Sequence, residues 1–247
     1  MSSPTRSNTG YTLITGATST LGAGVARHRA STEPLLLHGR DREALEALAS
    51  ELRIFTEVRT WCRDLTNPAG LHGAFLQLLE QDGLRIERVV HAAGSLKILP
   101  FRSFELTDTM AIFSVNVFSI IEILRVLACK PYRDHLRSVV LLSAFFSKFG
   151  DKGNAVYSSS KGALNSLVKG LAVELPQTRF NVLILGAVRT RMTEHLFSPG
   201  GEANRFARYL LGTGKPADVV DAVDFMLKDG LWMTGQEVFL DGGASAC

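Results

Sequence analysis

Residues 11–30 read YTLITGATSTLGAGVARHRA, and this stretch decides the fold. It opens with a short apolar, β-favouring run, Tyr11–Thr15, which is typical of a buried strand. The run breaks at Gly16, and a helical stretch follows at 21–30. The sequence therefore predicts a strand, a glycine turn and a helix at the start of the chain.

The same alternation of apolar runs and helical patterns continues to the end of the chain. Further strands are expected at 34–38, 54–61, 88–92, 138–143, 180–185 and 237–240. Helices are expected at 41–52, 68–81, about 107–128, 155–175 and about 216–227. Such strands must be buried on both faces. The pattern predicts an α/β fold with a Rossmann-like, doubly wound parallel sheet of about seven strands, covered by helices on both faces.

A chain of 247 residues fits one domain of this class, since single α/β domains extend to about 250 residues. We expect a flexible tail at 1–10 and a single domain at 11–247. Residues 191–215, rich in Gly, Ser, Pro and Arg, follow the sixth expected strand at the edge where such folds bind ligands. This segment is predicted to be a lid.

Composition and charge exclude several classes of protein. No uninterrupted apolar run approaches the ~18 residues of a membrane span, and residues 1–10 lack the apolar core of a signal peptide. The net charge is +3 with scattered basic residues, which disfavours a nucleic-acid partner. Cys62, Cys129 and Cys247 have spacings that suggest neither a disulfide framework nor a zinc site. We therefore expect a soluble, cytoplasmic protein with no metal, membrane or nucleic-acid partner.

The turn Thr15–Gly22 places glycines between a strand and a helix. A helix amino terminus offers free N–H groups and a partial positive charge, and glycines let the backbone close on a pyrophosphate. A plain strand-to-helix turn would have the same composition. The place of this turn after the first strand favours dinucleotide binding.

The residues after the second expected strand bear on which dinucleotide binds. This position usually holds an acid that binds the ribose 2′-hydroxyl, whereas an arginine accommodates a 2′-phosphate. Arg40 stands there and favours NADP(H) over NAD(H). Asp41 is the competing signal, although one position later it can cap the following helix.

Tyr157 and Lys161 stand four residues apart in a helical stretch, so both side chains lie on one face, one turn apart. A nearby ammonium lowers the pKa of a phenol from about 10 and makes it a usable proton donor or acceptor near neutral pH. Alone, such a pair is more often a surface contact. Together with the glycine turn it indicates acid–base chemistry beside a nucleotide.

Taken together, these motifs resemble the short-chain dehydrogenase/reductase family over nearly the whole chain, and within it the 3-oxoacyl-[acyl-carrier-protein] reductases. The motifs that match, in order, are Thr15–Gly22, Asp64-Leu65, His91–Gly94, Asn116, the Tyr157/Lys161 pair, Leu185–Thr190 and 234–243. The resemblance implies cofactor contacts at Gly16, Thr18, Ser19, Thr20, Leu21, Gly22, Arg40, Asp64, Leu65, Ala92, Ala93, Gly94, Tyr157, Lys161, Gly186, Val188 and Thr190.

The resemblance also implies hydride transfer between NADP(H) and a carbonyl or alcohol carbon. Tyr157 would be the general acid or base, Lys161 would lower its pKa and hold the nicotinamide ribose, Asn116 would keep a water in the proton relay, and a serine would bind the substrate oxygen. The substrate would be a small or carrier-bound carbonyl compound. A homodimer or homotetramer is expected through the long helices at about 107–128 and 155–175.

Four positions depart from the family pattern. Thr20 replaces the middle glycine of the turn, His91 and Ala92 replace two asparagines, and Leu185 replaces a proline. The catalytic serine position falls on Ala144, which has no hydroxyl.

Two other serines lie close to Ala144 in the sequence. Ser143 faces the opposite side of a strand unless a bulge turns it, and Ser147 lies further along the loop. Three explanations stay open: Ser143 acts through a local bulge, the chain is a weakened family member, or the alanine was introduced in place of serine.

The substrate is indicated only by what surrounds the expected site. An apolar pocket is predicted from the residues after the fourth and fifth strands, although they could equally be core; they are Leu96, Ile98, Leu99, Phe145, Phe146 and Phe149. Four arginines near the lid could meet an anionic carrier or only solvate a loop; they are Arg189, Arg191, Arg205 and Arg208. A catalytically weak dinucleotide-binding protein, acting as a sensor or partner subunit, remains the alternative function, with a nucleotide-sugar epimerase or dehydratase as a minor one.

Overall fold

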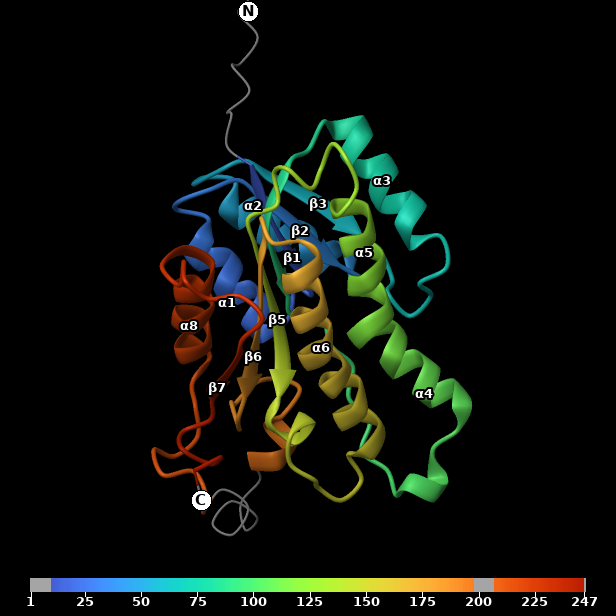
Figure 1. The fold of residues 1–247 in the computed structure, drawn as a ribbon, viewed down its shortest axis with the longest axis vertical. Coiled ribbons are helices and arrows are strands. Elements are labelled where there is room, and N and C mark those ends of the chain that lie inside the picture. The colour runs from blue at the N-terminus through green and yellow to red at the C-terminus, as the bar shows by residue number, and fades with distance from the viewer. Residues whose placement is uncertain (1–9, 198–206, 247) are drawn as a thin grey trace, which may run out of the picture.

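Seven parallel strands form one sheet in the computed structural model, which describes residues 10–197 and 207–246 (Figure 1). The strand order is β3-β2-β1-β4-β5-β6-β7. Strands are added to one side of β1 up to β3, and the chain then crosses back and adds β4 to β7 on the other side, so the order of addition reverses where β1 and β4 lie side by side. The strands are β1 Tyr11–Thr15, β2 Leu35–Gly39, β3 Val58–Cys62, β4 Ile86–His91, β5 Ser138–Ala144, β6 Arg179–Leu185 and β7 Glu237–Leu240. In sheets of this kind ligands bind at the carboxyl ends of the strands beside such a reversal.

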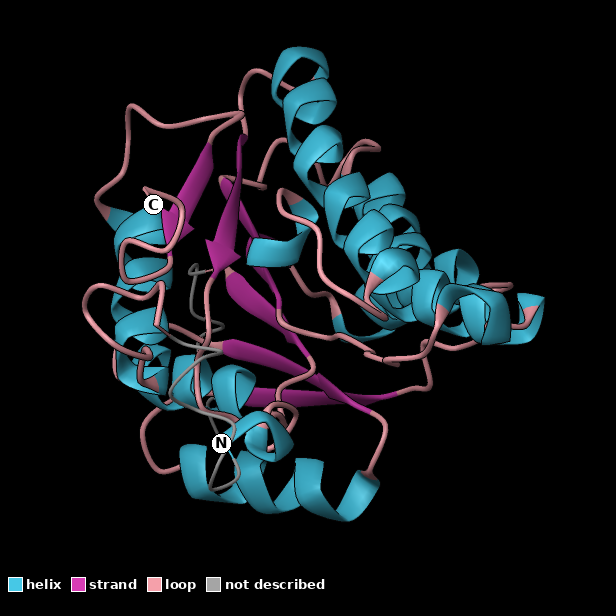
Figure 2. Cartoon of the chain, turned by 90° about the horizontal axis from the view of Figure 1, so that it is seen from below, coloured by secondary structure: helices cyan, strands magenta, loops and turns pink. Residues whose placement is uncertain are grey.

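Helices cover both faces of the sheet, as the view in Figure 2 shows. One layer contains α1 Thr20–Arg29, α2 Arg42–Leu52 and α8 Pro216–Lys228. The other contains α3 Leu71–Asp82, α4 Leu106–Phe113, α5 Ser119–Leu127 and α6 Ala155–Glu174. This arrangement confirms the predicted doubly wound α/β fold.

The hydrophobic core lies in two slabs because successive strand residues point to opposite faces. In β1, Leu13 packs in the α3–α5–α6 slab, and Ile14 packs in the α1–α2–α8 slab. In β5, Val139 and Leu141 face the first slab while Val140 faces the second. All five side chains are fully buried, so both faces of the strands are covered as the apolar runs required.

The long helix expected at 107–128 is interrupted. Helices α4 and α5 join through a π turn, Ser114–Phe118, and π turns are common at functional sites. Residues 106–127 also reach the length and hydropathy of a membrane span, which corrects the expectation that nothing in the chain does. In its most apolar 18-residue window 56% of the residues are buried, and α5 packs on α3 within the core slab, so it is a core helix.

The start of β3 differs most from the prediction, while the other strand ends differ by at most two residues. The apolar run at 54–61 suggests a strand from Ile54, but β3 begins at Val58. Ile54 and Phe55 lie in the turn after α2 and are 77% and 64% exposed. These two apolar residues therefore belong to a surface turn and not to the sheet. Residues 1–9 of the expected tail and residues 198–206 of the expected lid lie outside the described residues.

Candidate active site

The glycine turn between β1 and α1 packs against the end of β4. Gly16 has a positive φ of 64°, and a Cβ there would lie 2.7 Å from Cα and N of Ala93. A Cβ on Gly22 would lie 2.2 Å from the Gly16 carbonyl oxygen. Ser19 caps α1 by accepting the Gly22 N–H at 3.1 Å. Both glycines are therefore required, and the turn presents the amino terminus of α1 at the carboxyl edge of the sheet.

Thr20, which stands where the family has a glycine, is exposed and begins α1. Its hydroxyl accepts the N–H of Arg191 at 3.3 Å. The side chain thus connects the glycine turn to the loop after β6.

His38 supports the turn from the end of β2. Its Nδ1 accepts the Gly16 N–H at 3.3 Å, and its Nε2 donates to the Arg63 carbonyl at 3.0 Å. Since an N–H only donates and a carbonyl only accepts, His38 is neutral with its proton on Nε2. Burial lowers its pKa to about 4.

The residues predicted to bind the adenosine end lie after β2 and β3. Arg40 and Asp64 are exposed, and Leu65 is buried. The pKa of Asp64 is held below its usual range, first by the Thr66 N–H that donates to its carboxylate at 2.9 Å and also by the charge of Arg40. Asp41 accepts the Ala44 N–H at 3.1 Å as the amino-terminal cap of α2, the role expected for it.

Lys161, on α6, is buried at the end of β5. Its Nζ donates to the Leu142 carbonyl at 2.8 Å, and the Ser143 hydroxyl donates to the Lys161 carbonyl at 3.1 Å. A methyl group built on Gly94 would lie 3.6 Å from Lys161 Nζ and 3.8 Å from Asn116 Oδ1. The ends of β4 and β5, the π turn and α6 therefore meet at one place.

Tyr157 lies half-buried one turn before Lys161. Burial raises the pKa of Tyr157 to about 12, and burial lowers the pKa of Lys161 to about 8. The expectation that Lys161 lowers the pKa of Tyr157 is thus corrected in this structure. The physical reason is that the loss of solvation of the phenolate dominates, while the Lys161 ammonium is directed to the Leu142 carbonyl.

Asn116 is fully buried in the π turn and joins two segments of the site. Its Oδ1 accepts the Ser95 N–H at 2.7 Å, and its Nδ2 donates to the Ser95 carbonyl at 3.0 Å. Nδ2 also donates at 2.9 Å to the hydroxyl of Ser160, which in turn donates to the Tyr157 carbonyl at 2.7 Å. The amide therefore holds the loop after β4 against the turn of α6 that carries Tyr157 and Lys161.

His91 connects the same π turn to the glycine turn. Its Nε2 donates to the Asn116 carbonyl at 3.2 Å, which leaves Nδ1 to accept the Thr15 hydroxyl at 2.8 Å. Thr15 Oγ1 in turn accepts the Ala93 N–H at 3.3 Å. Burial, followed by the charge of Lys161, lowers the pKa of His91 to about 3. His91 is therefore neutral and links the two halves of the site.

Both candidate serines, Ser143 and Ser147, make hydrogen bonds within the protein. Strand β5 pairs with β6 in unbroken register from Ser138 to Ala144. Ser143 is buried, and its hydroxyl donates to the Lys161 carbonyl. The bulge that would let Ser143 act on substrate is absent from this strand. Ser147 accepts the Asn165 Nδ2 at 2.8 Å.

The loop after β6 closes another side of the site. A Cβ on Gly186 would lie 2.8 Å from Cε1 of Tyr209. Val188 is buried, and its carbonyl accepts the Thr193 hydroxyl at 2.7 Å, while Thr190 N–H donates to Thr193 Oγ1 at 2.9 Å. At the far end of the expected lid, Gly214 N–H donates to the Ala187 carbonyl at 2.9 Å. Both ends of that segment are therefore fixed to this loop.

The aromatic residues after β5 pack on one another. Phe145 is buried and stacks on Phe149 with centroids 4.3 Å apart, while Phe146 meets Phe145 edge-on at 5.9 Å. The guanidinium of Arg208 lies over Phe145, 4.7 Å from its centroid. Phe145 thus belongs to the packing. Arg205 lies outside the described residues.

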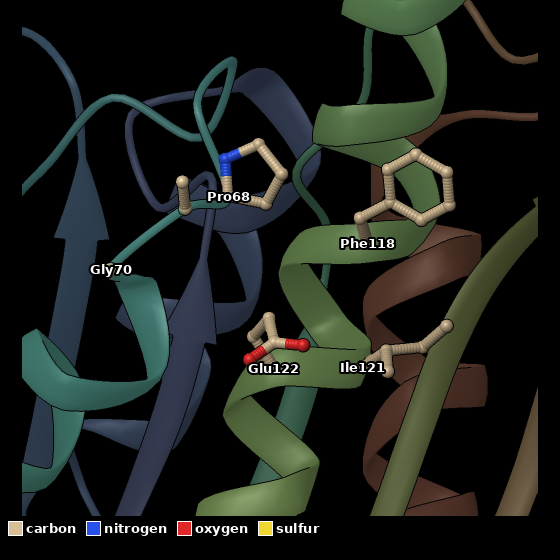
Figure 3. Close-up of a pocket in the computed structure, with 6 residues that line it drawn as sticks. Pro68, Gly70, Phe118, Ile121 and Glu122 are labelled. Atoms are coloured by element: carbon tan, nitrogen blue, oxygen red, sulfur yellow. The ribbon is translucent and has the colours of Figure 1, made fainter.

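A hollow of about 350 Å³ lies elsewhere, between the start of α3 and the long helix (Figure 3). Its lining consists of Pro68, Ala69, Gly70, Phe118, Ile121 and Glu122. These residues include none of the predicted site residues, so this hollow is separate from the candidate site.

Comparison with known proteins identifies the family. A family model described as enoyl-(acyl carrier protein) reductase matches residues 16–245. The chain belongs to the short-chain dehydrogenase/reductase (SDR) family. Cyclopentanol dehydrogenase of Comamonas testosteroni is 30% identical to this SDR chain over 192 residues, 74% of this chain and 75% of the relative. An uncharacterized oxidoreductase of Mycobacterium tuberculosis is 31% identical, covering 95% of this chain and 91% of its own.

Solved structures share the fold of this SDR chain. Gluconate 5-dehydrogenase of Burkholderia cenocepacia, in complex with NADP and tartrate, matches with a TM-score of 0.88 over 96% of each chain at 23% identity. A 4-hydroxyisoleucine dehydrogenase complexed with NADH matches with a TM-score of 0.88 over 96% of this chain at 22% identity. The protein is therefore an oxidoreductase of the SDR family with the family's Rossmann-like fold.

The sequence indicated some contacts of this SDR site and missed others. Asn116, Lys161 and Gly94, all expected in the site from the sequence, do lie at one place in the structure. It missed His91 as a connector, although a histidine at the carboxyl end of a buried strand was a usable signal. It also missed Ser160, one of three consecutive serines that sequence alone does not distinguish, and His38, whose contact with Gly16 depends on the pairing of β1 and β2.

Proposed function

We propose that this SDR oxidoreductase transfers a hydride between NADP(H) and the carbonyl or alcohol carbon of a ketone or a 3-oxoacyl substrate, thioesters included. The observation that carries the proposal is the meeting of Asn116, Lys161 and Gly94 at the carboxyl edge of the sheet, with Tyr157 one turn before Lys161. The nicotinamide, when bound, supplies the hydride chemistry. The residues of this chain position it and handle the proton.

Tyr157 is the proposed proton donor and acceptor. A phenol with a pKa near 12 is protonated at neutral pH, which is the form that gives a proton to a carbonyl oxygen during reduction. Lys161, with a pKa near 8, keeps most of its positive charge at pH 7 and would hold the ribose of the nicotinamide. Asn116 would hold the loop after β4 and the catalytic turn of α6 in place.

The residues at the glycine turn fit a dinucleotide. Gly16, Ser19 and Gly22 would present α1 to the pyrophosphate, and Asp64, Leu65, Ala92, Ala93, Gly94, Gly186, Val188 and Thr190 line the same edge of the sheet. A preference for NADP(H) is supported by Arg40, which is exposed, and by Asp41, whose carboxylate already caps α2. An arginine fork suits a 2′-phosphate.

A second function is supported by two specific observations. Ala144 offers no hydroxyl to the substrate oxygen, and the Ser143 hydroxyl is committed to Lys161. Thr20 adds a side chain at the turn that would approach the pyrophosphate. The second candidate is a catalytically weak dinucleotide-binding SDR protein that acts as a sensor or partner subunit.

One assay series separates the two functions. Binding of NADPH and of NADH is measured by fluorescence, and NADPH oxidation is then followed with simple ketones and short 3-oxoacyl thioesters. Tight NADPH binding with turnover supports the reductase. Tight binding without turnover across the panel supports the weak binding protein, and no binding of either nucleotide contradicts both.

We further propose a cytoplasmic homodimer or homotetramer. The outer face of the long helix leaves Leu106 75% exposed and Met110 exposed, and Val173 on α6 is also exposed. A second apolar face holds Phe225, Leu231 and the fully exposed Trp232. Unpartnered apolar patches of this kind mark interfaces. Size-exclusion chromatography with light scattering tests this, and a monomer at micromolar concentration would contradict it.

A further inference from the structure

We propose that Arg208 binds a carboxylate on the substrate, so that the carbonyl compound reduced by this protein is an oxo acid. This inference rests on the proposed function. Its basis is a cluster at the carboxyl ends of β5 and β6, formed by Phe145, Phe149, Arg208 and Tyr209.

The cluster stands beside the reacting position. Phe145 directly follows Ala144, the residue in the catalytic serine position at the carboxyl end of β5. Tyr209 lies 6.3 Å from Phe145 between ring centroids, and its Cε1 lies 2.8 Å from where a Cβ on Gly186 would be. Arg208 is therefore held between the ends of β5 and β6, at the edge where Tyr157 and Lys161 lie.

The stack orients the guanidinium and leaves its donors usable. Arg208 Cζ lies 4.7 Å from the Phe145 centroid and 5.6 Å from the Phe149 centroid, over a pair of rings only 15° from parallel. A cation–π contact fixes where the guanidinium lies and leaves N–H donors for a ligand. Arg208 is exposed and forms no ion pair with a carboxylate of residues 10–197 or 207–246. This is a preorganised fork for a planar carboxylate.

The surrounding charges favour a monoanion over a phosphate. Asp151 and Asp241 both act electrostatically on Tyr209, the neighbour of Arg208. Lys148 and Lys169 both pair with Glu237, at 2.5 and 2.6 Å. A dianionic phosphate would meet stronger repulsion from the two aspartates than a carboxylate does.

The test measures binding without hydride transfer, so that Ala144 does not limit it. The protein is saturated with NADP⁺, and acetoacetate or its methyl ester is titrated by calorimetry into wild type, Arg208→Gln, Arg208→Lys and the control Arg137→Gln. Arg137 is an exposed arginine just before β5, at the opposite edge of the sheet. Thermal melting confirms that each variant is folded.

We expect wild type to bind acetoacetate at least about tenfold more tightly than the ester, since bonds to a charged group are the stronger ones. Arg208→Gln should abolish this difference, Arg208→Lys should keep part of it, and Arg137→Gln should keep all of it. Equal binding of acid and ester by wild type overturns the inference, as does an equal loss of both ligands in Arg208→Gln. Weaker NADP⁺ binding in Arg208→Gln overturns it in favour of a cofactor contact. Wild type that binds no NADP⁺ contradicts the proposed function itself.

Discussion

The hydroxyl of Ser143 donates a 3.1 Å hydrogen bond to the main-chain carbonyl of Lys161, within the helix that carries Tyr157. The bond ties the end of β5 to the catalytic turn of α6. Lys161 returns the contact through its ammonium, which donates to the Leu142 carbonyl. Ser143 is therefore a structural residue of the site.

Substitutions at the neighbouring positions 143 and 144 of β5 are expected to change different quantities, stability at the first and turnover at the second. Ala144→Ser should raise turnover of NADPH with a ketone or oxo acid by about tenfold or more, because one donor to the substrate oxygen contributes about a hundred- to a thousandfold in related sites. Ser143→Ala should leave turnover nearly unchanged and lower the free energy of unfolding by about 1 kcal/mol, since the Lys161 carbonyl loses a buried partner. Steady-state kinetics and urea unfolding measure both. Loss of turnover in Ser143→Ala would show that Ser143 acts in catalysis.

Arg40 and Asp41 are adjacent but should act on different quantities. Arg40→Gln should weaken NADPH binding by about tenfold or more and leave NADH binding unchanged, because only NADPH carries the 2′-phosphate. Asp41→Ala should lower the free energy of unfolding by about 1 kcal/mol through loss of the α2 cap and should leave the NADPH/NADH ratio unchanged. Fluorescence titration and urea unfolding separate the two effects. A change of cofactor preference in Asp41→Ala would show that this carboxylate reaches the ribose.

Ser160 is expected to be a positioning residue for the catalytic turn. It is fully buried, accepts from Asn116 Nδ2 and donates to the Tyr157 carbonyl. Ser160→Ala leaves the buried Asn116 amide with one partner fewer, so we expect a loss of about 1–3 kcal/mol in the free energy of unfolding. We also expect a lower kcat with little change in NADPH affinity. Ser159→Ala is the matched control, since Ser159 is exposed and its hydroxyl donates to the Val156 carbonyl within its own helix. A purely structural role would lower stability and leave the kcat of the folded protein unchanged.

Features that depend on local sequence pattern could be predicted from the sequence, whereas features that depend on tertiary packing could not. The alternation of apolar runs identified the strands and both helical layers, and the spacing of Tyr157 and Lys161 put them on one helical face. The π turn at Asn116 could not be found, because an apolar helical pattern continues through it. The Arg208 stack joins residues about sixty positions apart, and the depth at which Tyr157 is buried decides the direction of its pKa. Both depend on packing that no local pattern encodes.

The two buried histidines make the site sensitive to acid. Folded-state pKa values near 4 for His38 and near 3 for His91 lie below the ordinary value of about 6.5. Well above pH 6.5 both residues are neutral in the folded and unfolded chain and add no pH dependence. As the pH falls below 6.5 only the unfolded chain takes up these protons, so stability falls until the pH reaches the folded-state values. Between pH 7.5 and 5 each histidine should lower the free energy of unfolding by on the order of 2 kcal/mol.

Replacing one of these histidines isolates its contribution. Urea unfolding of wild type and His91→Asn at pH 7.5, 6.5, 5.5 and 5.0 should give a shallower loss of stability in the variant, smaller by on the order of 2 kcal/mol across this range. The comparison uses the pH dependence, so any constant cost of losing the bonds to Thr15 and Asn116 cancels. Parallel curves for wild type and His91→Asn would show that His91 becomes protonated in the folded protein as readily as in the unfolded chain.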